Sequence, residues 1–344
     1  MTAADLLGGA ILAALVLYAL LGGADFGGGI WDLLATGPRK RAQRELVEHA
    51  IGPIWEANHV WLILVIVLLF TAFPKAFAAI SITLFVPLVL LLFGIVLRGA
   101  AFTFRTYDTP EDRVQVRWGL VFSASSVLAP VVLGVIVGAI ASGRLAGPPE
   151  GVDPLAWLAP FPLAVGFFAA ALFAFLAATY LAVEARDALR EDFRRRAIGA
   201  GAAVFLAAAL AGVLSWYDAP LVFAGLVRRG FSLPLHAATA VAAVTAFAAL
   251  FRRRYRLARA AAAAQVTLIV LGWGASQYPY LVVPGLTLAT ASAPRATQVA
   301  VLWALAAGAI FLFPALYLLF RVFKGERPFS VLDRRPAPGP RGEG

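Results

Sequence analysis

The stretch IGPIWEANHVWLILVIVLLFTAFP, residues 51–74, decides the class of this chain. Its apolar run suits a membrane-spanning helix, which takes about 20 residues, yet it begins with Glu56, Asn58 and His59. A charged side chain at the bilayer centre costs about 2.5–3.5 kcal/mol on insertion scales. We therefore expect these polar side chains to face a protein interior or water, and to be functional candidates.

The composition of the whole chain agrees with a membrane protein. Hydrophobic residues make up 61% and charged residues 14%, against about 45–50% and about 25% in ordinary soluble domains. The charges stand in short clusters between apolar blocks, instead of along one face of amphipathic helices. There is no cysteine, which excludes disulfides, iron–sulfur clusters and thiolate chemistry. We predict an all-α, polytopic membrane protein.

Nine membrane spans can be drawn on hydropathy, with 145–160, rich in proline, as a loop. The first span is expected to be retained, because residues 1–5 lack the positive charge of a signal peptide. We expect one transmembrane domain over 1–333, with pseudo-halves near 1–141 and 160–284, and a disordered cytoplasmic tail over 334–344. The predicted spans are 6–30, 52–73, 78–103, 118–141, 160–183, 197–217, 233–251, 260–284 and 299–323.

Lysine and arginine in the loops predict the orientation, because cytoplasmic loops carry an excess of both. Of the 29 such residues, 24 fall on one side of the nine-span scheme and 5 on the other. This places the N-terminus outside and the C-terminus in the cytoplasm. The net charge of +10 is therefore a topology signal and requires no nucleic-acid partner.

Four ionisable residues fall within the predicted spans at similar depth in the cytoplasmic half: Asp25, Glu56, His59 and Arg98. Glu56 and His59 share a helix face, three residues apart. Asp25 lies in LLGGADFGGGI, 20–30, where glycines permit close approach of a neighbouring helix or subunit.

Two roles for this group remain open at this point. As a proton-uptake path, its carboxylates and imidazole would take up and release protons, since burial can bring carboxyl pKa values towards neutrality. As a structural lock, Arg98 would neutralise one acid and hold the first three helices together. Arg98 is also near enough to the membrane surface to extend its head group to water.

Haem or metal binding by this chain is not expected. The only histidines are His49, His59 and His236, and Met1 is the only methionine. His59 and His236 fall at opposite sides of the membrane, so they cannot form the matched pair that a bis-histidine haem needs. The glycine-rich stretch 22–29 lies within a membrane helix and has no strand before it, so it does not fit a phosphate loop.

Six segments together resemble subunit II of the cytochrome bd family of quinol oxidases. The resemblance covers nearly the whole chain and is strongest over 20–105. The segments are GGADFGGG (22–29), IGPIWEANHVWL (51–62), FTAFPKAF (70–77), LRGAAFTFR (97–105), QYPYLVVP (277–284) and TLATASAP (287–294).

The resemblance implies a nine-helix subunit of the bacterial inner membrane, built as two four-helix bundles plus one peripheral helix. It would pair with subunit I, which carries haems b and d and the quinol site, and with a small single-helix accessory subunit. The complex would oxidise quinol and reduce oxygen to water with cytoplasmic protons. Trp55, Asn58 and Trp61 would then line an oxygen route or a quinone groove, where a structural quinone or lipid can bind.

This chain departs from the family pattern at several positions. Gly22 stands where the family often has an earlier aspartate, and Glu56 with Ala57 replaces an aspartate and a glycine. His59 replaces a glutamate or glutamine, which keeps a proton-relay group but changes the charge.

Our leading hypothesis is therefore an oxidase subunit without a redox centre of its own. In it, Asp25 and Glu56 conduct protons, His59 assists and Arg98 tunes their charge. A proton-coupled secondary transporter is the alternative of another class; the absence of a matching polar set in the second half of the chain argues against it. A purely structural scaffold is the third hypothesis.

Overall fold

A computed structural model describes residues 2–51, 55–107, 113–145, 153 and 155–323, and nearly all of this is helix. The predicted tail, 334–344, lies outside the described residues. The first half contains α1 (Ala3–Leu33), α2 (Lys40–Ile51), α3 (Trp55–Asn58), α4 (Val60–Ala72), α5 (Pro74–Thr83), α6 (Phe85–Tyr107) and α7 (Arg113–Ser142). The second half contains η1 (Ala156–Leu158), α8 (Pro160–Glu184), α9 (Asp187–Asp218), α10 (Pro220–Arg228), α11 (Ser232–Phe251), α12 (Tyr255–Gln277), β1 (Tyr280–Val282), β2 (Leu286–Thr287), α13 (Leu288–Ala291) and α14 (Arg295–Phe323).

Eight helices of the described residues are long and apolar enough to span a membrane, and the bent pair α4–α5 makes a ninth if it is counted as one span. The break lies between α4 and α5, whose axes differ by 117°. Phe73 leaves helical geometry there and Pro74 starts α5, as expected of a residue that can begin but not continue a helix. α3 and α4 together cover the predicted second span. The predicted third span was wrong at its start, because 78–83 belong to α5 and α6 begins at Phe85.

Three further differences from the predicted spans have local causes. The eighth span does not reach residue 284, since α12 ends at Gln277 and an antiparallel β1–β2 pair follows; Pro279 and Pro284 lack the N–H that helix would need there. α9 begins ten residues earlier than predicted, because the arginine-rich segment before the apolar run is also helical. α2 and α10 were not among the predicted spans; α2 is polar and includes His49.

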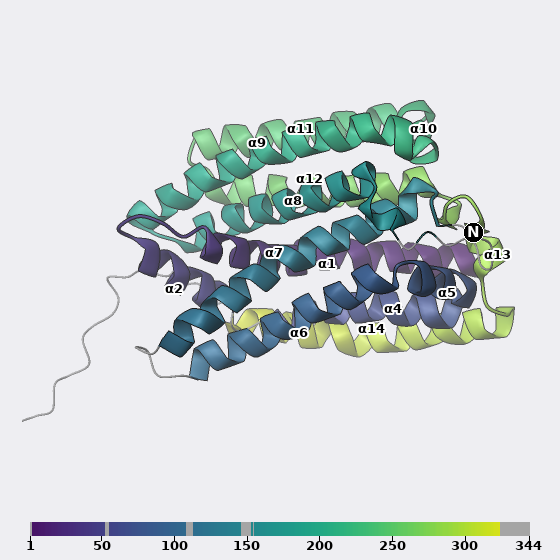
Figure 1. The fold of residues 1–344 in the computed structure, drawn as a ribbon, viewed down its shortest axis with the longest axis horizontal. Helices are drawn as coiled ribbons and strands as arrows, with labels where there is room; N and C mark the ends of the chain where they lie inside the picture. Colours follow the sequence, from purple (N-terminus) through teal and green to yellow (C-terminus); the bar gives the residue numbers. More distant parts are fainter. Residues whose placement is uncertain (1, 52–54, 108–112, 146–152, 154, 324–344) are drawn as a thin grey trace, which may run out of the picture.

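Two helices, α1 and α8, form the centre of the fold (Figure 1). α8 packs against α9, α7, α1 and α12, and α1 packs in addition against α7, α4, α12 and α14. Gly27 permits the approach of α1 to α8, because a Cβ there would overlap the carbonyl group of Phe173. The close neighbour expected beside the glycines is thus another helix of the same chain.

The last helix, α14, lies at the edge of the molecule along α1 and α4 (Figure 1), and none of its most apolar window is buried. This matches the expected peripheral helix. The division of the remaining helices into two four-helix bundles stays a prediction.

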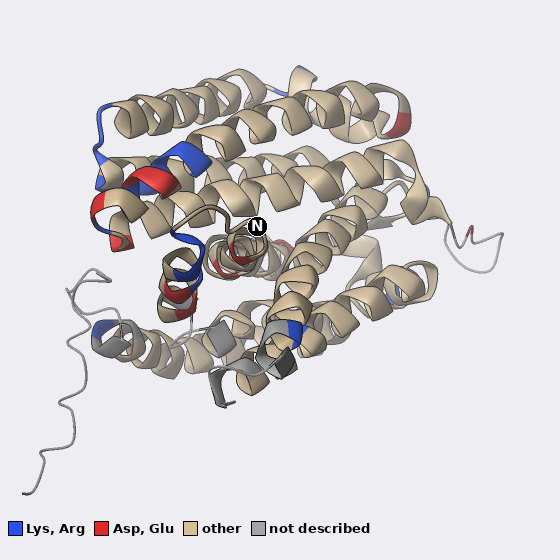
Figure 2. Ribbon diagram, turned by 60° about the vertical axis from the view of Figure 1, so that its left-hand side comes forward, with Lys and Arg blue, Asp and Glu red and all other residues tan. Residues whose placement is uncertain are grey.

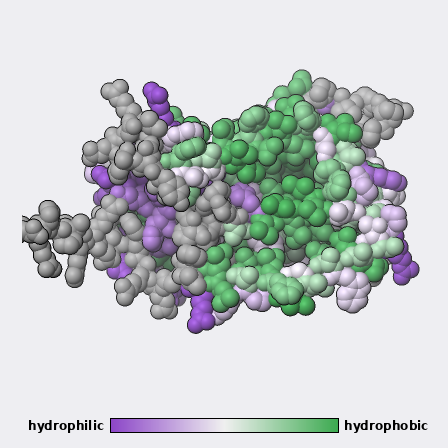
Figure 3. All heavy atoms as spheres, turned by 90° about the horizontal axis from the view of Figure 1, so that it is seen from below, coloured by the Kyte–Doolittle hydropathy of each residue, from purple (hydrophilic) through white to green (hydrophobic). Residues whose placement is uncertain are grey.

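Charge and apolar surface are separated as a membrane protein requires. Figure 2 shows charged residues gathered along α2 and where α8 turns into α9, while long stretches of the spans carry none. Figure 3 shows a broad apolar face on the side of α4, α6 and α14. Exposed apolar side chains of these three helices include Ile63, Phe70, Leu92, Phe93 and Phe311.

Candidate functional site

A buried ion pair joins α1 to α6. Arg98 Nη2 lies 2.8 Å from Asp25 Oδ1, and the two side chains are 1% and 3% exposed. The same nitrogen also donates a hydrogen bond to the backbone carbonyl of Asp25, at 3.3 Å. Two residues 73 positions apart, singled out from sequence because charge in a membrane span is costly, are therefore direct partners.

The rest of the guanidinium of Arg98 is enclosed by α1 and α7. Its Nε donates to Ser126 Oγ at 3.0 Å, and its Cζ lies 4.9 Å from the ring centroid of Phe26 and 5.1 Å from that of Phe122. Arg98 therefore does not extend to water. The alternative in which it reaches the membrane surface is wrong, because its hydrogen bonds and ring contacts hold it inside the protein.

Asn58 and Trp61 connect this region to the neighbouring helices. Asn58 is 2% exposed and its Nδ2 donates to the carbonyl of Leu21 on α1, at 3.3 Å. Trp61 is 4% exposed, and its ring centroid lies 6.3 Å from that of Phe313 on α14. Both residues thus face the protein interior.

His59 stands at the junction of α3 and α4 and points its ring at α1. Its ring centroid lies 6.2 Å from that of Tyr18 and 6.0 Å from that of Phe26. The side chains of Trp55 and Glu56 are outside the described part of the structure, although the backbone of both belongs to α3. Their roles stay predictions.

A second buried carboxylate, Asp32, was not among the sequence candidates. It has 0% exposure, and Ser123 Oγ on α7 lies 2.6 Å from its Oδ2. Arg44 of α2, which is partly exposed, lies 3.9 Å from the same oxygen and donates to the carbonyl of Asp32. The available signal was spacing: Asp32 follows Asp25 by seven residues, or about two helical turns on one face.

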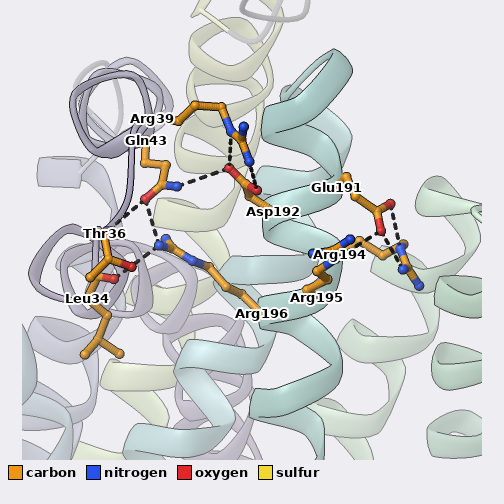
Figure 4. Close-up of polar contacts among 9 residues, drawn as sticks. All are labelled: Leu34, Thr36, Arg39, Gln43, Glu191, Asp192, Arg194, Arg195 and Arg196. Carbon is orange, nitrogen blue, oxygen red and sulfur yellow. Dashed lines mark hydrogen bonds and ion pairs between the residues drawn. The ribbon is translucent and has the colours of Figure 1, made fainter.

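A polar cluster covers the C-terminal end of α1, where arginines of the following segment and of α9 gather (Figure 4). Arg39 makes two hydrogen bonds to the carboxylate of Asp192, at 2.7 and 2.6 Å, and this pairing raises the pKa of Arg39 above its usual value. Gln43 also donates to Asp192, at 3.1 Å. Arg196 donates to Gln43 Oε1 at 2.7 Å and to the carbonyl of Leu34 at 3.1 Å. Arg196 of α9 and Arg44 of α2 thus both donate to backbone carbonyl groups at the C-terminal end of α1.

Within the parts of the chain that the structure describes, no group of three His, Cys, Asp or Glu side chains lies close enough to hold a metal ion. His236 Nδ1 is 2.7 Å from the carbonyl of Ser232 in its own helix, whereas His59 packs among aromatic rings of α1.

Together, the helices and the buried charges define a polytopic membrane protein. Its buried ionisable residues, Asp25, Asp32 and Arg98, lie towards the C-terminal end of α1. The sequence profile described as "Cytochrome bd terminal oxidase subunit II" matches residues 4–323. The chain belongs to this family and is a subunit of a quinol-oxidising oxidoreductase.

Relatives agree with this assignment. A putative cytochrome bd menaquinol oxidase subunit II of Bacillus subtilis is 24% identical over 91% of this chain and 93% of its own length. Subunit 2 of the cytochrome bd-I ubiquinol oxidase of Escherichia coli is 29% identical over 59% of this chain and 54% of its own length. A chain of the bd oxidase from Geobacillus thermodenitrificans shares the fold, with a TM-score of 0.79 at 22% identity over 94% of this chain and 99% of that one.

Proposed function

We propose that this chain delivers cytoplasmic protons to a haem-bearing subunit I, using a polar route along α1 that includes Asp25, Glu56, His59 and Arg98. The single observation that carries the proposal is the buried Asp25–Arg98 pair, at a depth where an ordinary helix contact would be apolar. In this complex the partner oxidises quinol and reduces oxygen to water with haems b and d.

Asp25 retains a carboxylate oxygen that can accept a proton. Arg98 binds Oδ1, while Oδ2 is buried with no hydrogen-bond partner among the described residues. A guanidinium stays protonated in proteins, so Arg98 acts as a fixed positive charge that orients Asp25. A proton arriving at Oδ2 neutralises the carboxylate and can leave from the same oxygen towards the next acceptor.

Two serines of α7 connect the Asp25–Arg98 pair with the protein surface at Arg44. Ser126 accepts the hydrogen bond of Arg98, and Ser123, one turn nearer that surface, contacts Asp32. Asp32 in turn lies beside the partly exposed Arg44. Hydroxyl and carboxyl groups both donate and accept protons, so we infer that Asp32 receives protons near the surface and passes them towards Asp25.

The polar route occupies one half of the membrane only, which favours delivery over transport. Seven and fourteen residues before Tyr18, the same face of α1 has buried Ile11 and Ala4. A proton-coupled transporter needs access from both sides, and neither the family match nor the fold match supports that alternative. Because lysine and arginine are concentrated in the loops on one side of the membrane, we propose that the N-terminus is external and the C-terminus cytoplasmic.

The other expectations belong to the same proposal. Residues 1–333 form one transmembrane domain in the bacterial inner membrane, beside subunit I and a small single-helix subunit. The interior positions of Asn58 and Trp61 support a lining role, with Trp55, for an oxygen route or a quinone groove. A structural quinone or a lipid would be the occupant of that groove.

The test is turnover of the purified complex containing Asp25→Asn, with quinol as electron donor and haem content measured on the same sample. We expect oxygen consumption per haem to fall at least about tenfold. Normalising to haem corrects for complex that is lost because the buried charge of Arg98 has no partner in this variant. Asp5→Asn is the matched control, since Asp5 is a partly exposed acid at the opposite end of α1. Full turnover in Asp25→Asn would remove the proton-delivery role.

A further inference from the structure

Tyr18 is a buried residue of α1 that neither the sequence candidates nor the ion pair includes. It is the middle residue of the 31-residue helix and is 1% exposed. Its hydroxyl is buried with no hydrogen-bond partner among the described residues. A phenylalanine would fill the same space without an unpaired hydroxyl, and leaving such a group unpaired is unfavourable. The hydroxyl therefore calls for an explanation beyond packing.

Position on the helix links Tyr18 to the two acids. Tyr18, Asp25 and Asp32 are spaced by seven residues, so each step is about 10 Å along the axis and turns only about 20° around it. All three side chains are buried. They form a line on one face of α1 that starts at Asp32, at the C-terminal end of the helix, and stops at Tyr18, in its middle.

The ring of Tyr18 lies along its own helix towards Asp25. A Cβ at position 22 would be 2.9 Å from its Cε2 atom, so Gly22 provides the space that the ring occupies. The ring centroid is 6.3 Å from that of Phe26, which also lies beside Arg98.

On the side away from α1, Tyr18 meets His59. Their ring centroids are 6.2 Å apart with planes tilted by 48°. Tyr18 thus has the imidazole at the start of α4 as a ring neighbour and precedes the buried carboxylate of Asp25 by two helical turns. Both neighbours exchange protons, whereas the next positions on the same face of α1, Ile11 and Ala4, cannot.

We propose that the Tyr18 hydroxyl is the inner relay of the proton route, passing protons from Asp25 towards His59 and the partner subunit. This inference rests on the proposed proton delivery and names the group at its inner end. The hydroxyl oxygen accepts a proton on a lone pair while its own O–H proton leaves on the other side, so the phenol is neutral before and after. A bound water can bridge each step where direct contact is too long.

The experiment uses Tyr18→Phe in the assembled complex, which removes only the hydroxyl. We expect quinol-dependent oxygen consumption to fall about tenfold or more with unchanged haem content. The solvent deuterium isotope effect on turnover should rise, because proton delivery becomes rate-limiting. Tyr180→Phe is the matched control: Tyr180 is a largely buried tyrosine of α8 beside Arg259, outside this line.

Two outcomes would overturn the inference. Wild-type turnover with a wild-type isotope effect in Tyr18→Phe would show that the hydroxyl serves packing alone. An equal loss in Tyr180→Phe would show a general effect of removing a buried phenol. If Tyr18→Phe assembles poorly, Tyr18→Ser, which restores an exchangeable hydroxyl without the ring, must recover turnover per haem above that of Tyr18→Phe. Loss in Asp25→Asn with full turnover in Tyr18→Phe would reject this relay and leave the proposed function standing.

Discussion

Two arginine–aspartate pairs of this protein have similar nitrogen–oxygen distances and opposite surroundings. Arg98 and Asp25 are 2.8 Å apart with side chains 1% and 3% exposed, whereas Arg39 and Asp192 are 2.6 Å apart with side chains 47% and 16% exposed. The exposed pair holds α2 against α9 at the membrane surface, where either residue can be hydrated if its partner is lost (Figure 4). The buried pair has no such alternative. Burial, rather than distance, therefore decides which pair controls assembly and chemistry.

Breaking the buried pair from the arginine side should have the largest effect. In Arg98→Gln, the carboxylate of Asp25 stays in the helix core without its counter-charge, at a cost of about 3–5 kcal/mol. We expect a marked loss of haem-loaded complex and a lower thermal midpoint by differential scanning fluorimetry in detergent. Unchanged yield and midpoint would mean that water reaches Asp25 freely.

Removing the charge of Asp32 should have an intermediate effect that appears in turnover instead of assembly. Asparagine keeps the size of Asp32 and can still accept the hydrogen bond of Ser123, but it cannot take up a proton. We expect Asp32→Asn to lower oxygen consumption several-fold at normal haem content. Ser123→Ala separates the two contributions: it retains the acid, so its turnover should lie between those of Asp32→Asn and the wild type.

Breaking the exposed pair should have the smallest effect. In Asp192→Asn, Arg39 loses a partner but remains in contact with water, and Gln43 and Arg196 still connect α2 with α9 and α1. We expect turnover equal to wild type and a shift of about 2 °C or less in the thermal midpoint. Repeating the melt at high salt should abolish that shift, because exposed ion pairs are screened. A loss as large as in Arg98→Gln would contradict the comparison.

The cost of charge in lipid made part of this site predictable from sequence. Asp25 and Arg98 stood out because each interrupts an apolar span, and helix rise alone put them at similar depth. Asp32 was missed since it lies near the expected end of its span, where an acid is unremarkable; only its contact with Ser123 marks it as buried. Tyr18 was missed because a tyrosine in an apolar run reads as packing, and its unpaired hydroxyl becomes visible only in three dimensions.

Hydropathy predicted the helices better than their ends. The apolar runs of α1, α7 and α8 are close to the predicted spans, because about 20 apolar residues have few alternatives to a membrane helix. The end of α5 at Thr83 and the short strands near Pro279 and Pro284 were read as parts of continuous spans. Hydropathy does not register the backbone donor that each proline lacks. The polar helix α2, which lies outside any span, gave no hydropathy signal.

The double variant Asp25→Asn/Arg98→Gln tests the central claim most directly, because it removes both charges of the buried pair and leaves no unpaired charge behind. Haem content, thermal midpoint and quinol-dependent oxygen consumption are measured beside both single variants. If Asp25 conducts protons, the double variant regains the haem content and midpoint that Arg98→Gln loses, while its turnover stays as low as in Asp25→Asn. Recovery of turnover together with assembly would mean that the pair only holds the helices in place.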